Sequence, residues 1–183
     1  MKINTIILVA FCTFMIPSFG QNIKDRNHKA TLKAIDSVEY DQAIKALDTK
    51  TFVIKFDRII FERLNKILGC DPQTNFFLLE GDNAILQAYE YDCTFDDIND
   101  NTCTYKCKAS GFKVSADNKD LRTIEMRLSK SIDGKVRITL FKNSAYCHIR
   151  IYGSPLYQRV TFTGKLSPLS KDDVFIGIDS KNL

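Results

Sequence analysis

Apolar residues recur at every second position along most of the chain after residue 50, and this period constrains the fold more than any other sequence feature. Val136, Ile138 and Leu140, for example, alternate with three polar residues. Such alternation is typical of a β-strand with one buried and one solvated face. The predicted strands cover residues 51–57, 75–79, 84–91, 104–114, 122–130, 135–142, 146–152 and 159–166.

Short turn signals separate these strands. Asp133-Gly134 is the strongest, because this dipeptide favours a primed turn that matches the strand twist. Gly81-Asp82-Asn83 predicts another turn, and the acidic stretch Asp92–Asn101 predicts a long loop. An antiparallel sheet of this kind must curl to cover its apolar side. We therefore expect a mainly β (α+β) fold, an antiparallel β-barrel or half-open barrel of about 8–9 strands with one N-terminal helix.

The N-terminal region predicts export. Residues 1–20 combine Lys2, an apolar core and small residues before an expected cleavage after Gly20, as in a secretory signal peptide. The alternative, a membrane anchor, is disfavoured because the apolar stretch is shorter than the roughly 20 residues that span a bilayer. No later segment is apolar enough to span a membrane. The protein is therefore expected in the periplasm or secreted.

The rest of the chain divides into a helical segment, a β domain and a tail. Residues 21–50 contain an amphipathic helix over 28–47, in which Leu32, Ile35, Ala43 and Leu47 share a face. Residues 51–178 form the antiparallel domain, and 179–183 the C-terminal tail. We expect the helix to cover one end of the sheet; binding of a partner by this helix is the alternative.

The charge balance disfavours nucleic acid as a partner. The chain has 26 basic and 22 acidic residues, and no basic run is interleaved with aromatic residues.

The cysteines that follow residue 20 make disulfides possible in an exported protein. Cys93 and Cys103 flank the expected acidic loop, and we predict that they pair across a hairpin. Cys147 is expected as a buried thiol, because it shares the inward register of Ile149. Cys70 and Cys107 then remain as a second candidate pair. Five reduced thiols are the alternative.

Several strand and turn patterns of the chain follow one another in a distinctive order and spacing: Phe52-Val53-Ile54 with Asp57-Arg58, residues 79–84, 136–140 and 160–166, and Val174-Phe175-Ile176-Gly177. In this order they resemble the exported, single-domain envelope proteins of Bacteroidota called the domain of unknown function 4251 family. The resemblance covers about residues 30–177. It implies a compartment and a fold type, but no catalytic residues. At residues 96–101 this chain has an acidic stretch, where the resemblance implies a glycine-rich loop.

The sequence offers one candidate binding surface. Tyr146, His148, Arg150 and Tyr152 share the outward register of one strand, and aromatic faces beside a guanidinium suit ligand binding. An ordinary solvated strand face is the alternative. The sequence contains no Gly-x-Ser-x-Gly turn and no Cys-x-x-Cys pair, which disfavours a His-dependent hydrolase, a thiol oxidoreductase and a zinc site. The acidic loop lacks the calcium-binding EF-hand spacing.

We therefore assign no catalytic, cofactor-binding or metal-binding residue and no cofactor. The leading hypothesis is a non-catalytic binding module of the bacterial cell envelope, whose partner is a small apolar ligand or an envelope protein. A periplasmic enzyme and a structural or inhibitory interaction protein are the alternatives. An empty barrel would favour an apolar ligand, and a filled one an interaction role.

Overall fold

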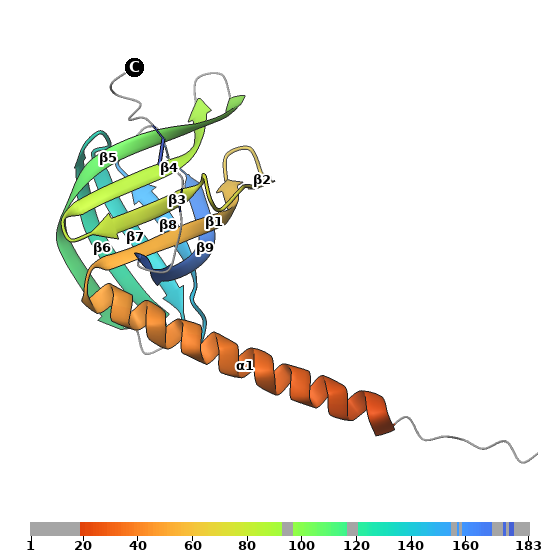
Figure 1. Cartoon of the computed structure of the whole chain (residues 1–183). Helices are drawn as coiled ribbons and strands as arrows, with labels where there is room; N and C mark the ends of the chain where they lie inside the picture. The colour runs from red at the N-terminus through yellow and green to blue at the C-terminus, as the bar shows by residue number, and fades with distance from the viewer. Residues whose placement is uncertain are drawn as a thin grey trace, which may run out of the picture. The chain divides into compact units, whose positions relative to one another are not determined.

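One antiparallel sheet dominates the computed structural model, which describes residues 19–92, 97–116, 121–154, 157, 159–169, 174 and 176–177 (Figure 1). The elements are α1 (Phe19–Asp48), β1 (Thr51–Phe61), β2 (Lys66–Gly69), β3 (Phe76–Glu80), β4 (Asn83–Asp92), β5 (Asp97–Ala116), β6 (Leu121–Lys130), β7 (Gly134–Phe141), β8 (Tyr146–Tyr152) and β9 (Val160–Pro168). The barrel and the second half of α1 belong to one compact unit, Ala34–Leu183.

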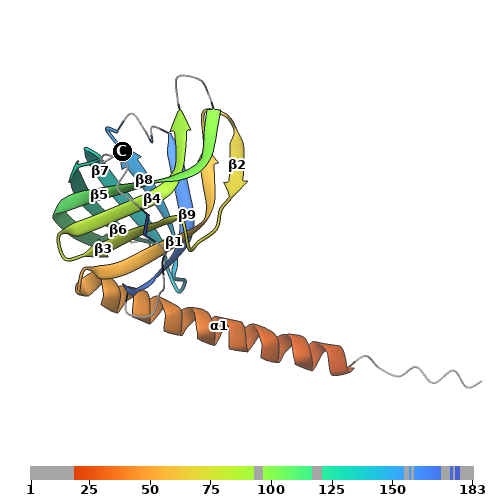
Figure 2. The ribbon, with the colours of Figure 1, turned by 45° about the horizontal axis from the view of Figure 1, so that its top comes forward.

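The sheet closes on itself. Neighbouring strands follow the order β1-β3-β4-β5-β6-β7-β8-β9, and β9 also pairs with β1, from Phe52 opposite Pro168 to Phe61 opposite Val160 (Figure 2). Closure leaves no open edge among these eight strands, while the short β2 pairs with the second half of β1 as an extra strand. The predicted antiparallel barrel is confirmed.

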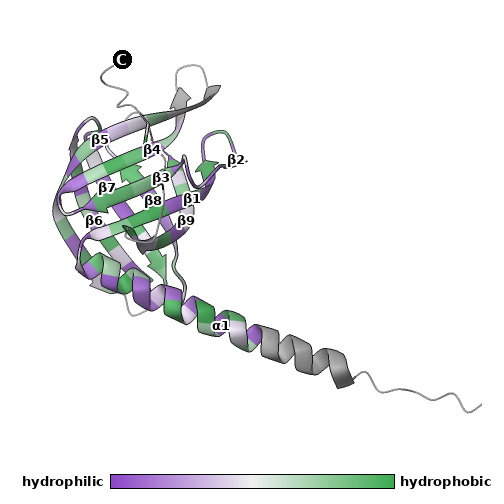
Figure 3. Cartoon of the chain, viewed as in Figure 1, coloured by the Kyte–Doolittle hydropathy of each residue, from purple (hydrophilic) through white to green (hydrophobic). Residues whose placement is uncertain are grey.

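Inward-facing side chains fill the barrel. The alternation of hydrophobic and hydrophilic residues along the strands (Figure 3) directs one set to the interior. Phe56 and Phe162 stack there with ring centroids 4.7 Å apart, and Tyr157 meets Phe162 edge to face at 5.4 Å. The largest fully buried side chains are Tyr157, Phe52, Phe56, Phe61, Phe76, Phe77, Phe162, Leu47, Ile54, Ile59, Leu79 and Leu86. Most of them belong to one core cluster, so the interior is a packed core.

A second, smaller core lies on the outer side of β1 and β3. Val53, Phe76 and Leu78 are buried there, and Leu169 and Val174 pack against them from beyond β9. Gly177 then donates its backbone N–H to the buried Gln87 side chain at 2.8 Å. The chain beyond β9 therefore covers part of the barrel's outer face.

The helix differs from its prediction in length and in burial. α1 begins at Phe19 rather than at residue 28. Ala43 and Leu47 are buried against the barrel core, as expected, whereas Leu32 and Ile35 are exposed. The predicted common face is therefore buried only in its second half, where the barrel covers it.

The expected long loop over Asp92–Asn101 is wrong. β4 continues to Asp92 and β5 begins at Asp97, and these two residues pair. Residues 93–96 lie outside the described residues. Cross-strand hydrogen bonding outweighs the unfavourable strand propensity of the acidic residues, because packing and pairing decide strand formation more than propensity does.

The Asp133-Gly134 hairpin exists, but its predicted turn chemistry is wrong. Val136, Ile138 and Leu140 are buried, as expected. Gly134 has no positive φ; the left-handed residue at this connection is Lys130, with φ 83°. A Cβ on Gly134 would instead lie 2.8 Å from the Tyr152 carbonyl oxygen. The glycine thus permits close approach of β7 and β8.

Candidate functional site

The predicted polar-aromatic stripe lies on the outer face of β8. Its odd-numbered neighbours Cys147, Ile149 and Ile151 are buried, while Arg150 and Tyr152 are exposed and Tyr146 and His148 are half-buried. The predicted orientation of all four residues is confirmed. Their role in binding stays a prediction.

The stripe contributes to two different pockets on the outside of the barrel. Tyr146 lines a pocket of about 410 Å³, which we call the helix pocket. His148, Arg150 and Tyr152 line a second pocket of about 370 Å³, which we call the arginine pocket. The remaining residues of the arginine pocket, Arg137, Thr139 and Phe141, come from β7.

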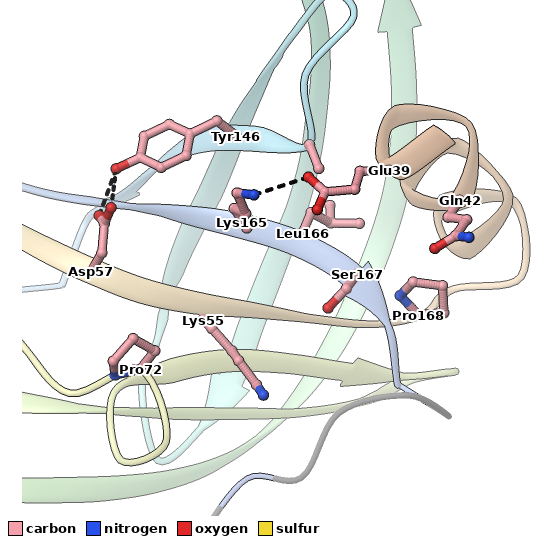
Figure 4. Close-up of a pocket in the computed structure, with 11 residues that line it drawn as sticks. Glu39, Gln42, Lys55, Asp57, Pro72, Tyr146, Lys165, Leu166, Ser167 and Pro168 are labelled. Atoms are coloured by element: carbon pink, nitrogen blue, oxygen red, sulfur yellow. Dashed lines mark hydrogen bonds and ion pairs between the residues drawn. The ribbon is translucent and has the colours of Figure 1, made fainter. Parts of the chain in front are cut away.

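The helix pocket lies between α1, β1, β8 and β9 (Figure 4). Four elements and the connections before β3 and β8 supply its lining: Glu39, Gln42, Lys55, Asp57, Pro72, Ala145, Tyr146, Lys165, Leu166, Ser167 and Pro168. The prolines give it apolar surface, and acids, lysines and a phenol give it polar groups. Sequence analysis missed every one of these residues except Tyr146.

A hydrogen-bonded cluster forms one wall of the helix pocket. The β1–β9 register shifts between Phe56 and Arg58, so a bulge lies at Asp57. Tyr146 Oη donates to Asp57 Oδ1 at 2.6 Å and accepts from Arg58 Nη2 at 2.9 Å. Thr163 Oγ1 also donates to Asp57 Oδ1, at 3.0 Å. The interruption of the apolar alternation by Asp57-Arg58 is the sequence signal that could have identified this wall.

An ion pair also lines the helix pocket. Lys165 Nζ lies 2.9 Å from Glu39 Oε2 and joins β9 to α1. Both side chains are partly exposed, so this pair contributes little to stability and serves mainly to position the two groups.

Two arginines dominate the arginine pocket. Arg137 donates Nη2 to Glu125 Oε1 at 2.8 Å, and its guanidinium lies over the Tyr152 ring at 5.6 Å from the centroid. Arg150 Nε donates to Thr161 Oγ1 at 2.8 Å, and its Nη2 donates to the Glu62 carboxylate. Sequence analysis placed Arg137 on the outer face without assigning it a role, and it missed Glu62.

His148 lines the arginine pocket. Its ring meets the Phe141 ring edge to face at 4.9 Å. Burial lowers the pKa of His148, and the positive charges of Arg150 and Arg58 lower it further. A lowered pKa keeps the imidazole neutral near physiological pH, where it can accept a hydrogen bond.

The cysteines form no disulfide among Cys70, Cys103, Cys107 and Cys147, so the second candidate pair, Cys70 with Cys107, is not formed. Cys147 is fully buried, as predicted, and burial raises the pKa of its thiol. Burial also raises the pKa of Cys70, with the charges of Asp57 and Asp71, to about 12.

Cys93 lies outside the described residues, so its disulfide with Cys103 stays a prediction. The hairpin argument for that bond is nevertheless wrong. Cys103 pairs with Ala88, four residues before Asp92 and roughly 13 Å along the strand.

Within the described part of the chain, no group of three His, Cys, Asp or Glu side chains comes together to hold a metal ion. No helix over the same residues is both long and apolar enough to cross a bilayer.

Comparisons with known proteins find a family and a similar structure. No curated protein matches the chain. A crystal structure of a DUF4251 family protein from Bacteroides eggerthii DSM 20697 has 22% sequence identity and a TM-score of 0.64, over 78% of this chain and 96% of that one. At this identity the likeness shows the fold alone. The sequence model of the domain of unknown function DUF4251 matches residues 34–166, and the chain belongs to this family.

Proposed function

We propose that this chain is an exported, non-catalytic binding module of the bacterial cell envelope, which holds its partner on the outer surface of the barrel. The observation that carries this proposal is the filled interior: Phe56, Tyr157 and Phe162 pack against one another where a lipocalin-type ligand would sit. The helix pocket, in contrast, lies on the outside.

The helix pocket has the size and chemistry of a binding site. Its volume of about 410 Å³ falls in the range of small-molecule pockets. Pro72 and Pro168 offer apolar contact, and neighbouring side chains hold the polar groups beside them in place. Such a mixture favours a partner that has both an apolar surface and polar groups, such as a short segment of an envelope protein.

The contacts of the two acids support binding rather than catalysis. Asp57 accepts hydrogen bonds from Tyr146 and Thr163, and Glu39 pairs with Lys165. Each carboxylate is thereby engaged by a positioned donor, whereas a general base needs a lone pair directed at the reacting proton. Export is supported by the N-terminal sequence, in which a basic residue, an apolar core and small residues succeed one another.

Titration of the isotope-labelled protein with small fragments tests the proposal. Each fragment carries an apolar ring and one polar group, and amide chemical shifts report where it binds. We expect shifts to concentrate around Lys55, Tyr146 and Lys165. Ser167→Trp fills the pocket and should abolish these shifts. Lys113→Trp, at an exposed position of β5 outside the pocket, is the control and should leave them unchanged.

Two outcomes contradict the proposal. Shifts confined to interior residues such as Ile138 would indicate a ligand inside the barrel. Conversion of a fragment to a product by the unchanged protein, together with loss of that conversion in Ser167→Trp, would indicate an enzyme.

A further inference from the structure

The arginine pocket carries an inference that is independent of the helix pocket. We propose that this pocket binds a small organic anion, a carboxylate or phosphate monoester attached to an aromatic ring. The two arginines hold the anionic group, and Tyr152 and Phe141 contact the ring.

The two arginines are placed in opposition on neighbouring strands. The register pairs Arg137 of β7 directly with Arg150 of β8. Like charges directly across a strand pair repel, and natural sheets disfavour them. Glu125 and Glu62 offset part of this repulsion, and an anion that bridges the two guanidinium groups would offset more of it.

Each arginine binds a carboxylate that comes from a segment other than β7 and β8. Glu125 of β6 pairs directly with Arg137 and receives both its Nε and its Nη2. Hydrogen bonds from Lys135 and Arg137 lower the pKa of Glu125, so this acid stays charged. On the other side, Glu62 and Thr161 accept from Nη2 and Nε of Arg150. The two guanidinium groups are thus fixed from the flanks, in the manner of a prepared binding site.

Each arginine keeps donors for a ligand. A guanidinium has five N–H donors. Arg137 binds Glu125, and Arg150 binds Thr161 and Glu62, through Nε and Nη2 in both cases, and Arg137 also interacts with Tyr152. About half of each arginine side chain is exposed to solvent, so donors of both guanidinium groups are accessible to a ligand. Two fixed guanidinium groups suit a carboxylate or phosphate better than a lysine pair does, because their planar donors match the oxygen geometry.

Aromatic side chains make up much of the remaining lining. Tyr152 is 42% exposed, and Phe141 lies half-buried against His148. A ligand ring can stack on exposed aromatic faces, which adds affinity beyond that of the anion. The pocket volume of about 370 Å³ accommodates a single ring with its anionic group.

His148 supplies a reporter inside the pocket. The charged groups that lower its pKa are Arg150 on its own strand and Arg58 on β1; Thr139 faces it on β7 and Thr163 on β9. A bound anion opposes the field of the arginines and should raise the pKa of His148. The chain has two histidines, so His148→Gln assigns its imidazole signals.

The experiment titrates the full protein with phenyl phosphate, benzoate and inorganic phosphate while the His148 signals are followed by NMR across a pH series. We expect saturable shifts and a raised His148 pKa with both aromatic probes. Inorganic phosphate should bind at least about tenfold more weakly than phenyl phosphate, because it lacks the ring. Equal binding of phenyl phosphate and inorganic phosphate would overturn the aromatic part of the proposal.

Matched arginine variants locate the site. Arg137→Gln and Arg150→Gln should each weaken binding of phenyl phosphate by about tenfold or more. Arg127→Gln is the control, since Arg127 is also an exposed arginine paired with a carboxylate, Asp133, but lies outside the pocket. Amide spectra verify that each variant is folded. Absence of saturable His148 shifts at millimolar probe, or an equal loss in Arg127→Gln, would overturn the proposal.

Discussion

At the scale of single residues, the close approach of β9 to β1 requires a residue without a side chain, Gly164. Gly164 of β9 lies opposite Phe56 of β1 at the position where the two strands close the sheet. A Cβ at Gly164 would lie 1.9 Å from the Lys55 carbonyl oxygen and 2.7 Å from the Lys55 carbonyl carbon. Backbone atoms cannot rotate away as a side chain can, so the seam requires glycine.

Gly164→Ala should lower the free energy of unfolding by about 3 kcal/mol or more, because the strands must separate to admit the methyl group. Gly69→Ala is the control, since its Cβ would meet only the Asp57 carbonyl oxygen, at 4.0 Å. Urea unfolding followed by circular dichroism measures both. Equal stability of the two variants would mean that the seam is looser than the structure indicates.

His148 should make stability depend on pH. Burial, Arg150 and Arg58 lower its pKa in the folded protein below the ordinary 6.5. As the pH falls below about 6.5, the unfolded chain takes up a proton more readily than the folded chain, so the free energy of unfolding decreases. His148→Gln removes this dependence, and denaturant melts over a pH series should show a shallower loss in acid. A loss identical to that of the unchanged protein would exclude His148 as its cause.

At the scale of elements, burial rather than periodicity decides which part of a helix or turn matters. Ala43, Ala46 and Leu47 of α1 contribute to the main core, whereas Leu32 is 46% exposed. Gly134 likewise matters through its neighbour β8 rather than through its turn. Leu32 and Leu47 were assigned to one helix face from the sequence, but only Leu47 is buried.

Leu47→Ala should lower the free energy of unfolding by about 2–4 kcal/mol, because it leaves a cavity in a fully packed core. Leu32→Ala removes the same atoms from an exposed site and should change stability by about 0.5 kcal/mol or less. Thermal unfolding of the two variants tests this. Similar losses in both would show that the first half of the helix is also packed.

Substitutions at Gly134 should distinguish close approach from turn geometry. Gly134→Ala is expected to cost about 1–3 kcal/mol, and Gly134→Asn more, because the larger side chain meets the Tyr152 carbonyl oxygen and the Ile151 side chain. A turn that required positive φ would give the reverse order, since Asn adopts that conformation more readily than Ala. Chemical denaturation of both variants decides the order.

At the scale of the whole molecule, closure of the sheet gives the protein its filled interior and brings together the residues of its helix pocket. β1 and β9 lie at opposite ends of the barrel sequence, and their pairing joins the two edges that an open sheet would expose. The same closure brings Asp57, Glu62 and Lys165 beside the β8 stripe. The helix pocket therefore depends on closure, and closure also supplies the Glu62 carboxylate that binds Arg150 of the arginine pocket.

The mature protein should begin at Gln21, because a basic residue, an apolar core and small residues precede that position. Intact mass measurement of the protein from its native envelope fraction tests this prediction. A protein that retains residues 1–20, or that occurs with the cytoplasmic fraction, would contradict both the cleavage and the proposed compartment.

The sequence by itself determined the class of the fold and the side of the sheet on which each residue lies. In a strand with period-two alternation a side chain points either to the interior or to the outside. The buried Cys147 and the outward Arg150 and Tyr152 were therefore predictable from the local pattern. The turn signals at Gly81-Asp82-Asn83 and Asp133-Gly134 also marked the connections of two hairpins, β3–β4 and β6–β7. These properties depend on neighbours in the chain, and the sequence contains those neighbours.

Only the tertiary structure decided which outward residues meet. Tyr146 and Asp57 are 89 positions apart, and Arg150 and Glu62 are 88 apart. Their contact depends on the register of β9 against β1 and β8, and on the bulge at Asp57. Alternation predicts which face of the sheet a residue occupies, but it does not predict which residue of the neighbouring strand lies opposite. The packing of the interior and the closure of the sheet fix that position, because they select one register among many that share the same pattern.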